Sequence, residues 1–198
     1  MASIDLKDAY YSVPIAEEHQ KYLKFNWNGA FYKFKVFPNG LAICPRKFTK
    51  LLKPAYAWLR NQGNLSVSYI DDCYLQGSSY EECLDNVIKT IQLFHKLGFV
   101  IHPKKSVLLP TQSIKFLGFN LDSRSMKIYL TADRKQSIKN DCHMLLGTRH
   151  PEIRDVAMVL GKITSSFPGV MMGPLHYRCL DMKKQRRLKM PRGTTIRK

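Results

Sequence analysis

Two adjacent aspartates, Asp71 and Asp72, separate two short runs of β-favouring residues, and this stretch constrains the fold more than any other. The run before them, 65–69, alternates apolar with small polar residues, which is the period of a half-buried strand. The run after them, 73–75, is again β-favouring. We therefore expect a β-hairpin with the carboxylates at its tip, where Asp tolerates turn geometry. Taken alone, such a pair is more often a solvated turn.

A second acidic position changes that interpretation. Asp5 lies between Ile4 and Leu6 at the end of another predicted strand. Adjacent carboxylates repel each other, so a fold that holds them together usually supplies a cation. Hard oxygen ligands from two strand ends suit Mg²⁺, which takes one or two protein carboxylates together with waters and substrate phosphates. The pattern therefore predicts a site for two-metal phosphoryl transfer.

Five motifs follow one another over roughly residues 3–125. They occupy residues 5–15, 37–41 with Pro45, 69–72 (Tyr-Ile-Asp-Asp), 97–99 with Lys104 and Lys105, and 116–121. The chain resembles the reverse transcriptases of retrotransposons, and residues 160–163 and 173–178 look most like elements that carry a tyrosine recombinase. The resemblance implies an α+β polymerase palm, a ferredoxin-like or RRM-like antiparallel sheet with helices on one face. A small helical, thumb-like part would follow it.

The resemblance also implies roles for individual residues. Asp5, Asp71 and Asp72 would be catalytic and bind two Mg²⁺ ions, with Mn²⁺ as an alternative. Lys105 would be a general acid for the leaving pyrophosphate. The implied nucleotide-binding residues are Asp8, Ala9, Tyr10, Asn39 and Gly40, and the implied primer-binding residues are Phe116, Leu117 and Gly118. Without the resemblance, Lys105 would be a solvated loop lysine and Tyr10 a core aromatic.

The function implied by the resemblance is RNA-directed DNA synthesis. The partners would be an RNA or DNA template-primer and a deoxynucleoside triphosphate. The alternative is a catalytically silent remnant that keeps the palm and its affinity for nucleic acid. Met1 stands four residues before Asp5, whereas reverse transcriptases carry a long fingers segment upstream, so we expect a fragment or a late start. That favours the remnant, and the three retained aspartates disfavour it.

Charge and composition point to the same class of partner. The chain has 198 residues, 44% of them hydrophobic, and a net charge of +17. Such an excess attracts nucleic acid, although a solubilising surface or basic tail is the alternative. Five dispersed cysteines without a Cys-x-x-Cys pair argue against a disulfide scaffold and a zinc site. No apolar run reaches the ~18–20 residues of a membrane span, so we expect no membrane partner and an intracellular protein, cytoplasmic or nuclear.

Local patterns predict the elements. A hairpin is expected over 21–36 around Asn28-Gly29. Its lysines would protect an exposed strand edge, with a template contact as the alternative. Apolar spacing predicts a helix over 41–59, and Ser79 with Glu82 forms a capping box for the next helix. A short strand is expected at 99–101.

Further along, two strands are expected at 114–121 and 126–130, followed by helices from Thr131 and after Pro151. We expect a palm with partial fingers at 1–130, a thumb-like segment at 131–180 and a basic disordered tail at 181–198. The histidines are interpreted as surface or loop residues: His19, His95, His102, His143, His150 and His176.

Overall fold

The computed structural model describes residues 1–189, with side chains to residue 186, and divides into two compact units. These are Met1–Ile114 and Lys115–Lys198. The division falls after Ile114 rather than after Leu130, where we expected the palm to end. The physical reason is that the last strand before the helices packs against the 3-10 helix Phe167–Gly169, which ties it to the helical part.

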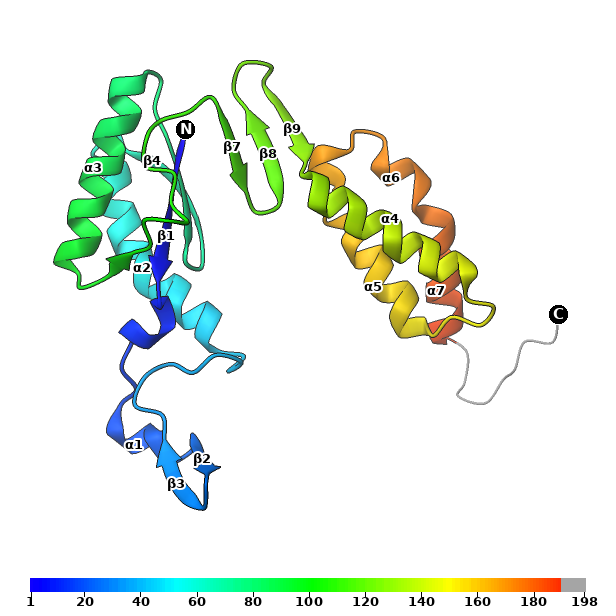
Figure 1. Cartoon of the computed structure of the whole chain (residues 1–198), viewed down its shortest axis with the longest axis horizontal. Helices are drawn as coiled ribbons and strands as arrows, with labels where there is room; N and C mark the ends of the chain where they lie inside the picture. Colours follow the sequence, from blue (N-terminus) through cyan, green and yellow to red (C-terminus); the bar gives the residue numbers. More distant parts are fainter. Residues whose placement is uncertain (190–198) are drawn as a thin grey trace. The chain divides into compact units, whose positions relative to one another are not determined.

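A four-stranded antiparallel sheet forms the first unit (Figure 1). Its strands are β1 (Ala2–Lys7), β4 (Leu65–Tyr69), β5 (Asp72–Gln76) and β6 (Val100–Ile101), in the order β4-β5-β1-β6. With helix α2 (Cys44–Asn61) after β1 and helix α3 (Tyr80–Lys96) after β5, the chain makes the βαββαβ unit of ferredoxin-like folds. The predicted α+β class is confirmed.

Both helices cover the same face of this sheet (Figure 1). The core joins alternate residues of β1 and β5 to the apolar stripes of α2 and α3, as the two periodicities require. The members with at most 2% exposure are Ala2, Ile4, Leu6, Phe48, Leu52, Tyr56, Leu59, Cys73, Leu75, Cys83, Val87 and Phe94. The opposite face of β1 and β5 is thereby left free for polar residues.

The helix ends follow from local chemistry. Pro45 occupies the first turn of α2, where a missing N–H costs no helical hydrogen bond. The Ser79 hydroxyl accepts the Glu82 N–H at 3.1 Å, and the Glu82 carboxylate accepts the Ser78 N–H at 2.9 Å. The predicted cap of α3 is therefore confirmed, with the return bond one residue earlier than in the usual capping box.

Between β1 and α2 lie four short elements. They are the 3-10 helix η1 (Ala9–Ser12), helix α1 (Glu17–Gln20) and the strands β2 (Lys24–Trp27) and β3 (Ala30–Lys33). The hairpin predicted around Asn28-Gly29 is confirmed, since φ is 50° at Asn28 and 78° at Gly29. Positive φ at both central residues is the signature of a type I′ turn.

The second unit joins a three-stranded sheet to a set of helices. Its sheet has the order β7-β8-β9, with β7 (Ser113–Phe116) beginning just before the division, then β8 (Phe119–Asp122) and β9 (Lys127–Leu130). Its α-helices are α4 (Ala132–Gly147), α5 (Ile153–Thr164), α6 (Gly173–His176) and α7 (Arg178–Lys189), and the 3-10 helix Phe167–Gly169 is η2. Helix α5 packs on both α4 and α7. Over residues 1–189, no helix has the length and apolarity to cross a membrane.

Two expectations about this unit were wrong. The single strand expected at 114–121 is two strands, because Leu117 and Gly118 have φ of 48° and 78° and form a tight turn. The disordered tail expected from residue 181 is helical as far as Lys189, since α7 packs on α5. The remainder of that predicted tail lies outside the described residues.

Candidate active site

The tip of the β4–β5 hairpin is a strained two-residue turn. Tyr69 pairs with Asp72, so Ile70 and Asp71 form the connection, and the predicted hairpin is confirmed. Ile70 has φ of 57°, a region that a β-branched residue rarely enters and that costs about 1–3 kcal/mol. Such a conformation persists only where surrounding contacts fix it. Here the Ile70 side chain packs against the core cluster.

Strand β1 brings Asp5 to this tip. Its register places Asp5 directly opposite Asp72, and directly opposite residues of an antiparallel pair share one face. Ile4 and Leu6, the neighbours of Asp5, are 1% and 2% exposed in the core. Asp5 therefore projects from the opposite, polar face of the sheet. The Leu6 N–H donates to the Asp71 carbonyl at 3.1 Å, which fixes the turn against β1.

Asp71 and Asp5 make it costlier to ionise Asp72. The pKa of Asp72 is raised, first by burial and then by the negative charges of Asp71 and Asp5. Lys105 opposes this effect and lowers the same pKa. A group with like charges as neighbours and partial burial is stabilised in its ionised form by a cation.

The fit of this site to magnesium can be judged from its donors. Within residues 1–189, no three His, Cys, Asp or Glu side chains gather into a complete metal-binding group. A structural zinc site would require such a cage. Mg²⁺ needs only one or two protein carboxylates, because waters and substrate phosphates supply its other ligands. Asp5 and Asp71 both face the same open cavity, so this donor set fits Mg²⁺.

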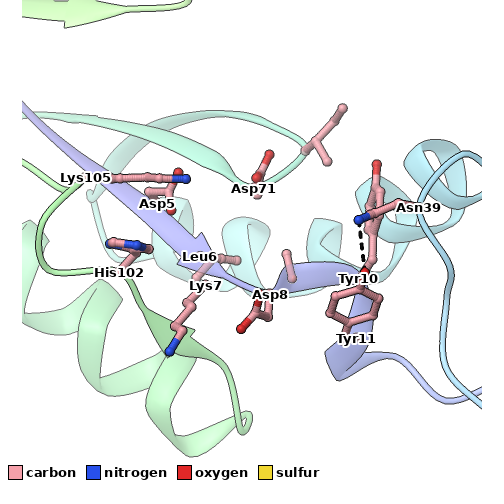
Figure 2. A pocket seen from close by; sticks show the side chains of 12 residues that line it. Asp5, Leu6, Lys7, Asp8, Tyr10, Tyr11, Asn39, Asp71, His102 and Lys105 are labelled. Atoms are coloured by element: carbon pink, nitrogen blue, oxygen red, sulfur yellow. Dashed lines mark hydrogen bonds between the residues drawn. The ribbon is translucent and has the colours of Figure 1, made fainter.

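That cavity has a volume of about 400 Å³ and lies beside the strand ends (Figure 2). Figure 2 shows the Lys105 side chain extended toward Asp5 on one side of it and the Asn39–Tyr11 pair on the other. The lining residues are Asp5, Leu6, Lys7, Asp8, Ala9, Tyr10, Tyr11, Asn39, Ile70, Asp71, His102 and Lys105. The structure thus brings together most of the predicted site residues. Asp72 and Gly40 follow the lining residues Asp71 and Asn39 in the sequence but do not line the cavity themselves.

Tyr10 serves the core and the cavity at once. Its ring meets that of Phe48 edge-on, with the centroids 5.5 Å apart. Its pKa is raised, first by burial and next by the charge of Asp71. The two interpretations offered by the sequence, core aromatic and pocket residue, are compatible. The Asn39 side-chain amide donates to the Tyr11 hydroxyl at 3.1 Å, so the turn before α2 is joined to η1 at the cavity wall.

The loop after β6 braces Asp5, a role that our sequence reasoning missed. The Asp5 N–H donates to Ser106 Oγ at 3.0 Å, and the His102 N–H donates to the Asp5 carbonyl at 2.9 Å. Ser106 Oγ in turn donates to the His102 carbonyl at 2.9 Å. His102 is a loop residue, as expected, but it is half-buried and lines the cavity. Its Nδ1 atom is buried and has no hydrogen-bond partner in the described part of the chain.

The predicted primer-binding residues lie in the second unit. Leu117 and Gly118 form the β7–β8 turn, and Phe116 ends β7. Arg134 locks this turn by donating to the Leu117 carbonyl at 3.0 Å and to the Ser165 carbonyl at 2.8 Å. A Cβ atom at position 118 would come within 2.8 Å of the Arg134 guanidinium. The positive φ favours glycine here, and a larger residue would also push the Arg134 guanidinium aside.

Comparisons with known proteins place this geometry in context. Residues 1–121 match the family described as reverse transcriptase (RNA-dependent DNA polymerase). The Pro-Pol polyprotein of Simian foamy virus type 1 is 28% identical over 138 residues, covering 70% of this chain and 11% of the relative. The Enzymatic polyprotein of Figwort mosaic virus (strain DxS) is 27% identical over 121 residues, covering 61% of this chain and 18% of the relative. The chain therefore spans less than a fifth of the length of these two relatives.

Solved structures share the fold. A foamy viral protease-reverse transcriptase in complex with RNA/DNA hybrid superposes with a TM-score of 0.66 and 23% identity, covering 91% of this chain and 24% of the other. A second foamy viral structure, in complex with double-stranded DNA, gives a TM-score of 0.68 and 21% identity over 93% of this chain and 34% of the other. The matched residues 1–121 contain the whole βαββαβ unit and all three aspartates. This chain belongs to the reverse transcriptase family.

Proposed function

We propose that this chain forms the catalytic part of an RNA-directed DNA polymerase, joining deoxynucleotides to a primer 3′-hydroxyl. The observation that carries the proposal is the pairing of Asp5 with Asp72 beside the strained Ile70-Asp71 turn. This pairing brings Asp5 close to Asp71, and both carboxylates line an open cavity of about 400 Å³. This is the arrangement that in-line phosphoryl transfer requires, with hard ligands at one end of a polar cleft.

Asp5 and Asp71 are the residues that would hold Mg²⁺, with Asp72 in a supporting role and Mn²⁺ as an alternative ion. When bound, these ions would acidify the primer 3′-hydroxyl and neutralise charge on the phosphates. The chain's own contribution is to hold the ligands in place before substrate arrives. The Ser106 hydroxyl and the Leu6 N–H do this through the backbone of Asp5 and Asp71 respectively.

The nucleotide would occupy the cavity between these carboxylates and η1. Asp8, Ala9, Tyr10 and Asn39 line this cavity, and Gly40 would approach the nucleotide from the turn next to Asn39. Tyr10 would lie under the sugar and clash with a 2′-hydroxyl, which favours deoxynucleotides. Its contact with Phe48 supports this role, because a ring packed against the core cannot swing aside.

Lys105 would give a proton to the leaving pyrophosphate. It lines the cavity and lowers the pKa of Asp72, so its ammonium lies near the reacting phosphates in this scheme. General acid catalysis by a positioned side chain is worth roughly 10²–10⁴-fold in rate. If Lys105 is instead a solvated loop lysine, replacing it should hardly change the rate of primer extension.

Template and primer would be held largely through phosphates, given the net charge of +17. Phe116, Leu117 and Gly118 would press the primer strand, with residues 1–130 as palm and partial fingers and residues 131–180 as thumb. We place the parent element among retrotransposons that carry a tyrosine recombinase, on residues 160–163 and 173–178. The five free cysteines support an intracellular location, cytoplasmic or nuclear.

Primer extension on an RNA template tests the proposal. The unmodified chain should extend the primer, and Asp71→Asn should abolish extension while leaving binding of the template-primer intact. Asp85→Asn is the matched control, because it removes one carboxylate from an exposed ion pair with Lys89 on α3. Extension that survives Asp71→Asn would refute the proposal. No extension in any form, with binding intact, would favour the silent remnant instead.

A further inference from the structure

The β2–β3 hairpin has two chemically different faces. Its register pairs Lys24 with Lys33, Phe25 with Tyr32 and Asn26 with Phe31. Opposite residues share a face and successive residues alternate between faces. One face therefore carries Phe25 and Tyr32, and the other carries Lys24, Lys33 and Phe31.

On the first face, Phe25 and Tyr32 contact other aromatic rings, whereas Trp27 is 65% exposed. Phe25 stacks on Tyr32 with centroids 5.6 Å apart and lies 4.8 Å from Phe34. Aromatic contacts at these separations stabilise a hairpin without any partner. This cluster explains why a two-stranded sheet with little other support forms here.

The second face, which we call the lysine–Phe31 face, is defined by Lys24, Lys33 and Phe31 and has no such internal explanation. Like charges directly opposite each other destabilise a strand pair. The Phe31 ring is 80% exposed. The sequence has no Asp or Glu between Glu18 and Asp71, and among the described side chains neither lysine forms an ion pair.

Edge protection accounts for only part of this pattern. Lysines on an exposed edge discourage pairing with another chain, but a large apolar ring beside the Lys24–Lys33 pair works against that purpose. A partner that neutralises two cations and covers one flat ring would remove both costs. Phosphates and bases of an unpaired strand have these properties, because every base has a face that stacks on an aromatic ring.

We propose that the lysine–Phe31 face binds single-stranded nucleic acid, with Lys24 and Lys33 on successive phosphates and one base stacked on Phe31. The inference deepens the proposed function, since the strand would be the unpaired template ahead of the primer terminus. Its binding step is independent of catalysis. It requires no metal ion and no nucleotide, so its failure is distinguishable from failure of the polymerase activity.

The test measures binding of the full chain to a primer-template with a single-stranded 5′ overhang and to the same duplex with blunt ends. The variants are Phe31→Ala and the double change Lys24→Ala with Lys33→Ala, assayed without nucleotide. Trp27→Ala is the control for Phe31→Ala, because this ring is also exposed, at 65%, and lies on the opposite face of the hairpin. Lys50→Ala with Lys53→Ala removes the same charge from α2 and controls for net charge.

We expect Phe31→Ala to weaken binding of the overhang substrate roughly 5- to 150-fold, the range of one stacked base. The double lysine change should lower the slope of log K against log[salt] by about 1.4, since each single-strand phosphate contact contributes about 0.7. Neither change should affect the blunt duplex, and neither control should reproduce the effect. Overhangs of RNA and of DNA, compared in parallel, identify which strand the face prefers.

Three results would overturn the proposal. One is equal loss on overhang and blunt substrates, which would make the face a duplex contact. Another is equal loss in the hairpin variants and their controls, which would reduce the effect to net charge. The third is unchanged binding accompanied by a lower melting temperature for Phe31→Ala, which would show that a protein segment covers the ring in solution.

Discussion

Asn86 holds the open end of the hairpin whose tip carries Asp71 and Asp72, and replacing it should destabilise the first unit. The side chain is 1% exposed. Its amide donates to the Leu65 carbonyl at 2.8 Å and to the Gln76 carbonyl at 3.0 Å, while its carbonyl accepts the Thr90 hydroxyl at 3.2 Å. Leu65 begins β4 and Gln76 ends β5, and the two form the pair furthest from the turn. One amide therefore holds both strands on helix α3.

The size of the destabilisation follows from the polar groups that lose their hydrogen-bond partners in Asn86→Ala. Asn86→Ala removes the donor from two partly buried carbonyls and the acceptor from one buried hydroxyl. Each orphaned buried group costs about 1–3 kcal/mol, with the lower end appropriate where water can enter. We expect the free energy of unfolding to fall by about 2–4 kcal/mol, or roughly 4–16 °C in melting temperature for a chain of this size.

Urea and thermal unfolding followed by circular dichroism measure this change. Asn140→Ala is the control, because Asn140 accepts a hydrogen bond from Gln136 on an exposed helix face and should alter stability by less than about 0.5 kcal/mol. Asn86→Asp should be worse than Asn86→Ala at neutral pH, since it aims a carboxylate at two carbonyls, and should recover in acid. Equal melting temperatures for Asn86→Ala and Asn140→Ala would refute this account of the hairpin.

Three further predictions concern the site and the second unit. Ser106→Ala should leave the Asp5 N–H without its acceptor, lowering the rate of primer extension while the melting temperature falls by only a few degrees; an unchanged rate would contradict the bracing role. Arg134→Lys keeps the charge but loses the guanidinium that bonds both the Leu117 and the Ser165 carbonyls. The free energy of unfolding should therefore fall by about 1–3 kcal/mol in a urea titration. Because the folded-state pKa of Asp72 is raised above its unfolded value, the folded protein binds the proton more tightly, so without divalent metal its stability should decline as pH rises through that raised pKa. Asp72→Asn should remove that dependence, as unfolding measured from acid to neutral pH in the presence of a chelator would show.

The local elements of the first unit could be predicted from the sequence because their signals are local. Asn28-Gly29 allows hardly any structure but a tight hairpin turn, and Ser79 with Glu82 caps a helix through atoms three residues apart. The Asp71–Asp72 tip was predictable for the same reason. That Asp5 would meet it depended on the resemblance and on two strand patterns, and the register Asp5 with Asp72 confirms it.

The rest of the site depends on contacts that leave no pattern in the chain. Ser106 and His102 hold Asp5 through backbone atoms about a hundred positions away, and no periodicity encodes such a bond. Gly118 marks a possible turn within the run 114–121, but no local pattern places the residue before it, Leu117, in the left-handed region. The distant Arg134 guanidinium holds the turn there through the Leu117 carbonyl.

The strained backbone at Ile70 bears on how the tip can move. A glycine at this position would reach many neighbouring conformations at little cost, and the turn would bend gradually. A branched side chain held in the left-handed region has few nearby alternatives, and the Leu6–Asp71 bond restrains the next residue. Moving the Asp71 backbone therefore means breaking that bond and leaving the conformational well together, so the tip should keep its carboxylate in one position rather than bend gradually.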